Sequence, residues 1–300
     1  MEIPTQYLPI QKNGISVAIR REDLIHPFVS GNKFRKLKYN LLKAKAENRT
    51  TLLTFGGAFS NHIAAVAFAG KEHGFKTIGI IRGDELQDKI QENPTLKFAQ
   101  ENGMQFEFVS RSHYSNKENP EFIDELKQKF GGFYFIPEGG TNDLAIKGCK
   151  EILTEADSQF EYICCAVGTG GTVSGLINSA LPHQKILGFP ALKGDFLQEE
   201  ICKFAKTDNW QLITDYHFGG YGKVNLELID FINNFSKSNK IPLDPVYTSK
   251  MAFGILDLID KNYFQANSKI LMIHTGGLQG IQGMNQLLAK KQLPKITTNV

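Results

Sequence analysis

The chain has 300 residues, of which 41% are hydrophobic and 22% are charged. This length and composition suit one large globular domain or two modest ones, and they exclude a disordered or collagen-like chain. Lys and Arg total 34 against 31 Asp and Glu, which leaves a formal net charge of +3 spread along the chain. Because no basic cluster stands out, a nucleic-acid partner is not expected, and a small molecule is the expected partner.

The sequence carries neither a long apolar run that would span a bilayer nor a basic and then apolar leader at its start. We therefore expect a cytoplasmic protein with no membrane partner. The four cysteines form no C-x-x-C pair, and the adjacent Cys164 and Cys165 lie in an apolar run typical of a buried strand. A disulfide framework or a zinc site is not expected.

Apolar runs bounded by glycine alternate with helical patterns from residue 50 onward. In the first half the expected strands and helices alternate through 51–55, 60–74, 76–83, 93–103, 104–110, 120–132, 132–140 and 144–156. The second half continues the pattern through 162–168, 172–181, 185–192, 195–205, 210–218, 226–235 and 269–277. Such alternation is typical of parallel sheets joined by crossover helices. The predicted fold class is α/β, with two open, twisted, mainly parallel three-layer α/β/α domains.

Two boundaries divide the chain. One follows the helical pattern 34–46, and the other lies near Ala156, where a long helix is expected to give way to the strand at Tyr162. We predict a large cofactor-binding domain from residues 1–45 and 156–300, and a small α/β domain from residues 46–155. The active site is expected in the cleft between them, because ligands bind beyond the carboxyl ends of the strands in such sheets.

The segment VGTGGTVSG, residues 167–175, joins a predicted strand to a predicted helix. Glycines let the backbone approach a ligand closely, and the amides of the first helical turn attract an anion. A phosphate fits this turn better than the alternative of a simple tight connection. The spacing matches neither the Gly-x-Gly-x-x-Gly dinucleotide fingerprint nor a P-loop, since Val173 stands at the last glycine position and no lysine follows.

The segment SGNKFRKLKYNLL, residues 30–42, has an apolar helical face and Asn32 as the expected N-cap. Lys33 then falls in the first turn, where the helix dipole disfavours a cation. Either its side chain points into solvent, or its amine is more easily neutral and nucleophilic. From this segment alone the solvated lysine is favoured, and Lys36 and Lys38 are expected at the surface.

The segment TFGGAFSNH, residues 54–62, is a second strand, glycine turn and helix start. Ser60 or Asn61 caps the helix that follows, and Ser60, Asn61 and His62 crowd together at the end of a strand where functional groups gather. A capping role and a role in a site are both open for these residues.

Five segments, SGNKFRKL, GGAFSNH, VGTGGTVSGL, PVYTSK and HTGG, occur in the order and spacing of fold type II, or tryptophan-synthase-β-like, pyridoxal-phosphate enzymes. Within that family the chain resembles the branch of 1-aminocyclopropane-1-carboxylate deaminase and D-cysteine desulfhydrase. The resemblance covers nearly the whole chain. It implies pyridoxal 5'-phosphate as the cofactor, a small amino acid as the substrate and a homodimer as the assembly.

The resemblance also implies roles for single residues. Lys33 matches the lysine that binds the cofactor covalently, Asn61 the asparagine that bonds its phenolic oxygen, and Ser60 a serine at the reacting face. The phosphate cup matches Gly168, Thr169, Gly170, Gly171 and Thr172. Tyr247 and Tyr221 match two tyrosines of the active site, and Thr275 matches a hydroxyl placed against the pyridine nitrogen. For each tyrosine the alternative is a half-buried aromatic with its hydroxyl in water.

One position departs from the deaminases. They carry a glutamate directly after the tyrosine that matches Tyr247, and here Thr248 stands in its place. A threonine cannot keep the pyridine nitrogen protonated, so the sequence favours α,β-elimination over opening of a cyclopropane ring. The expected reaction is elimination on a small amino acid such as D-cysteine, giving pyruvate, ammonia and sulfide, with the proton moved by Lys33, Ser60 or Tyr247. The alternatives are a cyclopropane deaminase, a non-catalytic binding relative and, less favoured, a nicotinamide enzyme.

Overall fold

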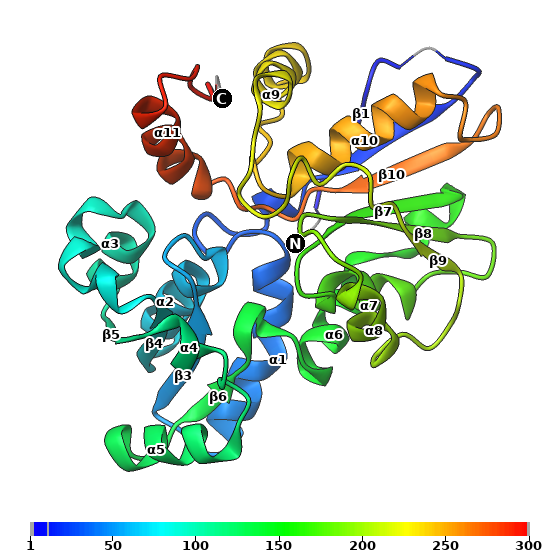
Figure 1. Cartoon of the computed structure of the whole chain (residues 1–300). Coiled ribbons are helices and arrows are strands. Elements are labelled where there is room, and N and C mark those ends of the chain that lie inside the picture. Colours follow the sequence, from blue (N-terminus) through cyan, green and yellow to red (C-terminus); the bar gives the residue numbers. More distant parts are fainter. Residues whose placement is uncertain (1–2, 11, 299–300) are drawn as a thin grey trace.

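The computed structural model describes residues 3–10 and 12–298 and contains two β-sheets, each with helices on both faces (Figure 1). Within these residues the larger sheet is parallel except for the pairing of its first two strands. Its order is β1 (Thr5–Tyr7), β2 (Ser16–Arg20), β10 (Lys269–Ile273), β7 (Tyr162–Val167), β8 (Lys185–Pro190) and β9 (Trp210–Leu212). The smaller sheet is parallel throughout, in the order β5 (Met104–Val109), β4 (Lys76–Arg82), β3 (Thr51–Gly56) and β6 (Tyr134–Ile136).

The helices fall into the layers that the alternating sequence predicts. Those of the first half are α1 (Asn32–Ala46), α2 (Asn61–His73), α3 (Pro94–Glu101), α4 (Arg111–Tyr114), α5 (Pro120–Phe130) and α6 (Asp143–Cys149). Those of the second half are α7 (Gly171–Ile177), α8 (Phe196–Cys202), α9 (Leu226–Asn239), α10 (Thr248–Asp260) and α11 (Gly280–Lys290). The predicted fold class, two three-layer α/β/α units, is confirmed.

Because side chains alternate along a strand, one continuous apolar strand packs against the helix layers on both faces of its sheet. In β7, Cys164 packs with α9 and α10 on one face of the larger sheet, and Cys165 packs with α6, α7 and α8 on the other. Successive side chains of a strand point to opposite faces, so a sheet covered on both sides needs a continuous apolar strand. The smaller sheet is built alike, with α1, α2 and α3 on one face and α4 and α5 on the other.

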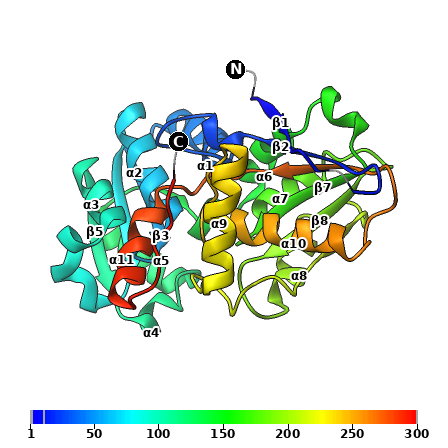
Figure 2. The same cartoon turned by 90° about the horizontal axis from the view of Figure 1, so that it is seen from above.

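Helix α1 lies between the two sheets, because it packs against α2 in the layer of the smaller sheet and against α6, which in turn packs against α7 of the larger one (Figure 1). Helices α9 and α11 share a further apolar cluster and lie side by side (Figure 2). Since α1 contacts both layers, the domain boundaries at residues 45 and 155 stay a prediction.

Several predicted elements are shorter in the structure, two of them markedly. The helix expected through Ala156 ends at Cys149, and two short 3-10 turns follow, the second of which begins with a capping box formed by Thr154 and Asp157. The buried Asp157 also pairs with Arg20 of β2, a contact from the far end of the sequence. The strand expected over 210–218 stops at Leu212, and a loop follows whose Phe218, Gly219 and Gly220 have positive φ.

The described residues hold neither a group of side chains suited to bind a metal ion nor a helix with the length and apolar character to cross a bilayer. All four cysteines are free thiols; Cys164 and Cys165 are buried in β7, as predicted.

Candidate active site

The two sheets enclose a cleft of about 1910 Å³. It lies beyond the carboxyl ends of β3, β4 and β7, where parallel sheets place their ligands. Nearly all of the residues predicted from separate motifs line it: Lys33, Ser60, Asn61, Gly168, Thr169, Gly170, Thr172, Tyr221, Tyr247 and Thr275. Gly171, the first residue of α7, is not among the residues that line the cleft. The site is therefore assembled from the beginning, middle and end of the chain.

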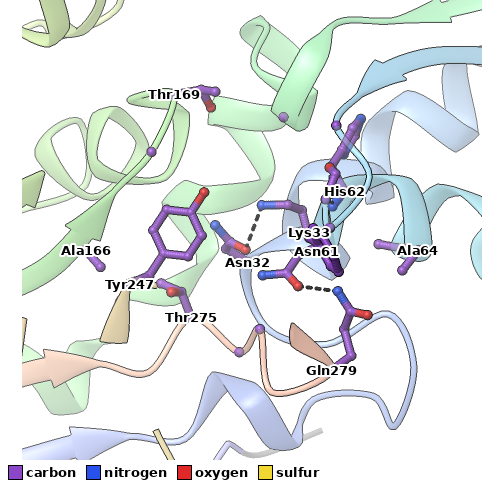
Figure 3. Close-up of a pocket in the computed structure, with 18 of the residues that line it drawn as sticks. Asn32, Lys33, Asn61, His62, Ala64, Ala166, Thr169, Tyr247, Thr275 and Gln279 are labelled. Atoms are coloured by element: carbon purple, nitrogen blue, oxygen red, sulfur yellow. Dashed lines mark hydrogen bonds between the residues drawn. The ribbon is translucent and has the colours of Figure 1, made fainter. Parts of the chain in front are cut away.

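Lys33 reaches the cleft from the first turn of α1. The N-cap is Gly31 and not Asn32 as expected, because a φ of 61° is needed there and a Cβ would lie 2.0 Å from the Thr275 carbonyl oxygen. The Asn32 side chain instead donates to Thr172 Oγ1 at 2.8 Å and accepts from Lys33 Nζ at 3.2 Å (Figure 3). Asn32 thus connects the amine to the glycine turn.

The environment of Lys33 makes its amine easier to deprotonate. Burial, followed by the positive charge of Lys36, lowers the pKa of Lys33 from 10.5 to about 7. Lys33 is half-buried, lines the cleft and is bonded to Asn32, so the solvated side chain favoured from its segment alone does not describe it. At neutral pH a large share of this amine is neutral and nucleophilic.

Lys36 was expected at the surface, and this prediction was also wrong. Its side chain is 2% exposed, and its ammonium donates to Gly139 O at 2.8 Å, Thr141 Oγ1 at 3.1 Å and Thr169 Oγ1 at 3.3 Å. No carboxylate lies within ion-pair distance of it in the part of the chain that the structure describes. Burial lowers the pKa of Lys36. A buried cation with only neutral oxygen partners suits an anion at this wall of the cleft.

The glycine turn after β7 lies beside this ammonium. Gly170 has a φ of 83°, and α7 begins at Gly171, where a Cβ would lie 2.7 Å from Thr141 Oγ1 and 3.1 Å from Lys36 Nζ. The hydroxyls of Thr169 and Thr141 are 2.6 Å apart. Glycine is thus required here for a turn that exposes backbone donors next to a buried cation, which is the chemistry of a phosphate site.

Ser60 and Asn61 lie at the start of α2. Ser60 caps the helix, since its Oγ accepts from His62 N at 3.2 Å and Ile63 N at 3.3 Å. Asn61 Oδ1 accepts from Gln279 Nε2, so the Asn61 amide nitrogen is turned toward Lys33 (Figure 3). Gln279 Oε1 in turn accepts from Thr95 Oγ1 at 3.2 Å. A chain of hydrogen bonds thus connects α2, α3 and the start of α11.

Tyr247 and Tyr221 meet at another side of the cleft, with ring centroids 6.1 Å apart in an edge-to-face arrangement. Tyr247 precedes α10, and burial raises its pKa well above the usual value, so its hydroxyl stays protonated near neutral pH. Tyr221 comes from the loop before α9, and 45% of it is exposed. The alternative of tyrosines pointing into water does not describe Tyr247, whose ring lies in the site (Figure 3).

Thr248 is buried, and its side chain does not face the cleft. Its hydroxyl donates to Asp244 Oδ1 at 2.7 Å and accepts from Asp244 N at 2.9 Å. Thr275 does line the cleft, and its carbonyl accepts from Asn32 N at 3.2 Å. Of the two threonines singled out by the sequence, Thr275 therefore lines the cleft and Thr248 does not.

Sequence reasoning missed Lys36, Gln279 and the bridging role of Asn32. Helical spacing offered one signal, since Lys36 is one turn after Lys33 and shares its face of α1. No local signal pointed to Gln279, because its partners Asn61 and Thr95 are remote in sequence. Together the site offers a nucleophilic amine, an anion cradle, an amide donor and protonated hydroxyls.

Comparisons with known proteins agree with this chemistry. The chain is 32% identical over 304 residues to a putative 1-aminocyclopropane-1-carboxylate deaminase of Pyrococcus horikoshii, covering 93% of this chain and 90% of the relative. It is 29% identical over 303 residues to the bifunctional D-cysteine desulfhydrase/1-aminocyclopropane-1-carboxylate deaminase of Arabidopsis thaliana, covering 91% and 75%. The crystal structure of an ACC deaminase homologue superposes with a TM-score of 0.83 at 30% identity, covering 96% and 94%. The family model described as pyridoxal-phosphate dependent enzyme matches residues 2–276, and the chain belongs to that family.

Proposed function

We propose that this protein is a pyridoxal-phosphate dependent lyase that removes the α-proton of a small amino acid, eliminates its β-substituent and releases a keto acid and ammonia. The observation that carries the proposal is the low-pKa amine of Lys33 in the same cleft as the glycine turn at Gly170. Cofactor and family are those of pyridoxal-phosphate enzymes. The substrate and the roles of single residues are the proposed part.

The residues of the cleft fit the cofactor. Its phosphate would lie in the turn formed by Gly168, Thr169 and Gly170, next to the Lys36 ammonium, where any Cβ at Gly171 would collide with Thr141. Its aldehyde would meet the Lys33 amine. Its phenolic oxygen would accept from the Asn61 amide, which Gln279 turns toward Lys33 (Figure 3). Three functional groups of the cofactor would thus each have a partner among the residues of this cleft.

When bound, the cofactor supplies a conjugated ring that accepts the electron pair left behind by the departing proton. The chain supplies orientation and proton transfer. Lys33 can take the α-proton because its amine is neutral in a large share of molecules near pH 7. Tyr247 can donate a hydrogen bond to a leaving group, since burial keeps its hydroxyl protonated. Ser60 stands at the start of α2, where the helix dipole attracts a substrate carboxylate.

Elimination from a D-amino acid such as D-cysteine is our first candidate. The argument is the one made at Thr248, where the deaminases carry a glutamate; this chain has a threonine whose hydroxyl is bonded to Asp244. The name of the Arabidopsis relative includes D-cysteine desulfhydrase. Opening of 1-aminocyclopropane-1-carboxylate is the second candidate, because the name of the Pyrococcus relative favours it.

A substrate panel tests the proposal. Purified protein is given D-cysteine, L-cysteine, β-chloro-D-alanine and 1-aminocyclopropane-1-carboxylate, and the keto acid is identified. Pyruvate from D-cysteine together with sulfide supports elimination. A keto acid one carbon longer, formed from the cyclopropane substrate alone, supports ring opening instead. A yellow protein that is bleached by borohydride and yields no keto acid from any of them would contradict catalysis and leave a cofactor-binding relative.

A further inference from the structure

Lys250 is a buried lysine that the proposed reaction does not use. It lies in the first turn of α10, its side chain is 1% exposed, and its ammonium donates to His217 O at 2.9 Å and Gly220 O at 2.8 Å. No carboxylate lies within ion-pair distance of Lys250 among the described residues. Burial lowers the pKa of Lys250 to about 8, against the raising effect of Asp244. A methionine would fill this space without that desolvation cost, so packing alone does not explain a lysine here.

The two carbonyl groups belong to the loop that carries Tyr221. At Phe218, Gly219 and Gly220 the backbone takes positive φ in succession, and the local turn has three bonds of its own, from Gly219 N to His217 Nδ1, Gly220 N to His217 O and Lys223 N to Gly220 O. The Phe218 ring also packs edge-to-face on Phe253 of α10 at 5.0 Å, whereas Tyr221 at the end of the tip is 45% exposed. Both carbonyls nevertheless converge on one ammonium from α10.

The beginning of this loop has a separate attachment. The Tyr216 hydroxyl donates to Asp257 Oδ2 at 2.6 Å, further along α10. The backbone of the tip, residues 217–222, is therefore bonded to α10 through Lys250, the Phe218 ring adds an apolar contact, and the beginning of the loop is bonded through Asp257. Tyr247 lies three residues before Lys250 at the start of the same helix. The start of α10 thus carries Tyr247 and also binds the loop that carries Tyr221.

We propose that Lys250 is a positioning residue that binds the tip of the loop and holds the Tyr221 ring against Tyr247 at the cleft. The claim that Tyr221 is positioned for substrate rests on the proposed function. The claim that Lys250 orders the backbone of the loop tip does not.

Hydrogen exchange measured by mass spectrometry tests the loop directly. In Lys250→Met we expect amide exchange in residues 217–222 to rise about tenfold, the size expected for loss of hydrogen bonds from a charged donor. Exchange in residues 213–216, attached through Asp257, should change little. The matched control is Lys185→Met, an exposed lysine at the start of β8 that should leave both segments unchanged. Unchanged exchange in residues 217–222 of a folded Lys250→Met protein would overturn the proposal.

Kinetics separate positioning from general stabilisation. Lys250→Met should raise KM about tenfold and change kcat less, and this effect should shrink in a Tyr221→Ala background, because residues that act through one another are not additive. An equal KM effect in both backgrounds would show that Lys250 does not act through Tyr221. If Lys250→Met does not fold, Lys250→Gln takes its place, since its amide still donates but reaches one atom less far. Should the wild type prove inactive on every amino acid, the proposed function fails while the exchange result still decides the role of Lys250.

Discussion

The cleft has two sides that differ in how they are held. The side formed by α1 and the turn before α7 is buried, and its polar groups bind one another, as Lys36 binds Thr169 and Asn32 binds Thr172. Two other residues that line the cleft, Tyr221 and Gln279, are exposed. A preorganised anion site needs fixed charges, and a substrate entrance needs side chains that can move. We therefore expect changes on the buried side to have larger effects on cofactor binding and chemistry than changes at the exposed residues.

Replacing Lys33 should have the largest effect. In Lys33→Ala the cleft loses its nucleophilic amine, and we expect the rate of keto acid formation to fall by about a thousandfold or more. We also expect loss of the absorbance that the cofactor shows near the visible range when it is covalently bound to the lysine. Lys38→Ala is the matched control, because Lys38 lies on the same helix with its side chain at the surface. A Lys33→Ala protein that still holds cofactor in a borohydride-reducible form would exclude Lys33 as the attachment site.

Replacing Lys36 should weaken cofactor binding by about ten- to a hundredfold, the range for losing a charged hydrogen-bond donor to an anion. Equilibrium titration of the cofactor-free Lys36→Met protein measures this. Its thermal stability without cofactor should be equal to or higher than that of the wild type at neutral pH, because burial disfavours the ammonium. Lys43→Met, an exposed change on α1, is the control. Loss of stability with unchanged cofactor affinity would assign Lys36 a structural role instead.

The lowered pKa of Lys33 predicts a pH dependence for cofactor uptake by the cofactor-free protein. The reacting form is the neutral amine, so the uptake rate should rise about tenfold per pH unit below its pKa and level off above pH 7. The folded chain also binds fewer protons than the unfolded one between about pH 7 and 10.5, so the Lys33 contribution to the free energy of unfolding increases with pH over that window. A rate that keeps rising tenfold per unit up to pH 10 would contradict a lowered pKa.

A change at an exposed residue of the cleft should have the smallest effect. In Gln279→Leu the Asn61 amide loses the donor that orients its oxygen, and we expect cofactor affinity to fall about threefold. Thr95→Val removes only the outer bond of this chain and should have a smaller effect still. Titration of both variants ranks them. Equal affinity of wild type and Gln279→Leu would show that Asn61 needs no orienting partner.

The fold was predictable because its signals are local. The continuous apolar run at Tyr162–Val167 is what a strand buried on both faces requires, and the glycine turn after it marked the start of α7. The same holds for Ser60, whose capping role follows from its place before α2. Where the extent of an element was wrong, as in the helix that ends at Cys149, a new turn begins at the capping box of Thr154 and Asp157, and Asp157 also pairs with the remote Arg20.

The candidate site was predictable in part. Motif order and family resemblance named Lys33, Asn61 and the turn at Gly170, and all three line one cleft. The burial of Lys36 could not be predicted, because the oxygens of Gly139, Thr141 and Thr169 come from segments more than a hundred residues away. From its sequence neighbours alone, a helical lysine such as Lys36 is predicted to be exposed, because the segments that bury it are remote in sequence.

By itself, the amino-acid sequence determined the alternation of strands and helices, the glycine turns and the family, since each depends on spacing along a single stretch of chain. The tertiary structure alone decided the charge state of Lys33, the burial of Lys36 and the attachment of the Tyr221 loop by Lys250. The reason is physical. A side chain's pKa and its hydrogen-bond partners depend on the desolvation and dipoles that other parts of the chain bring to it, and folding alone places those parts.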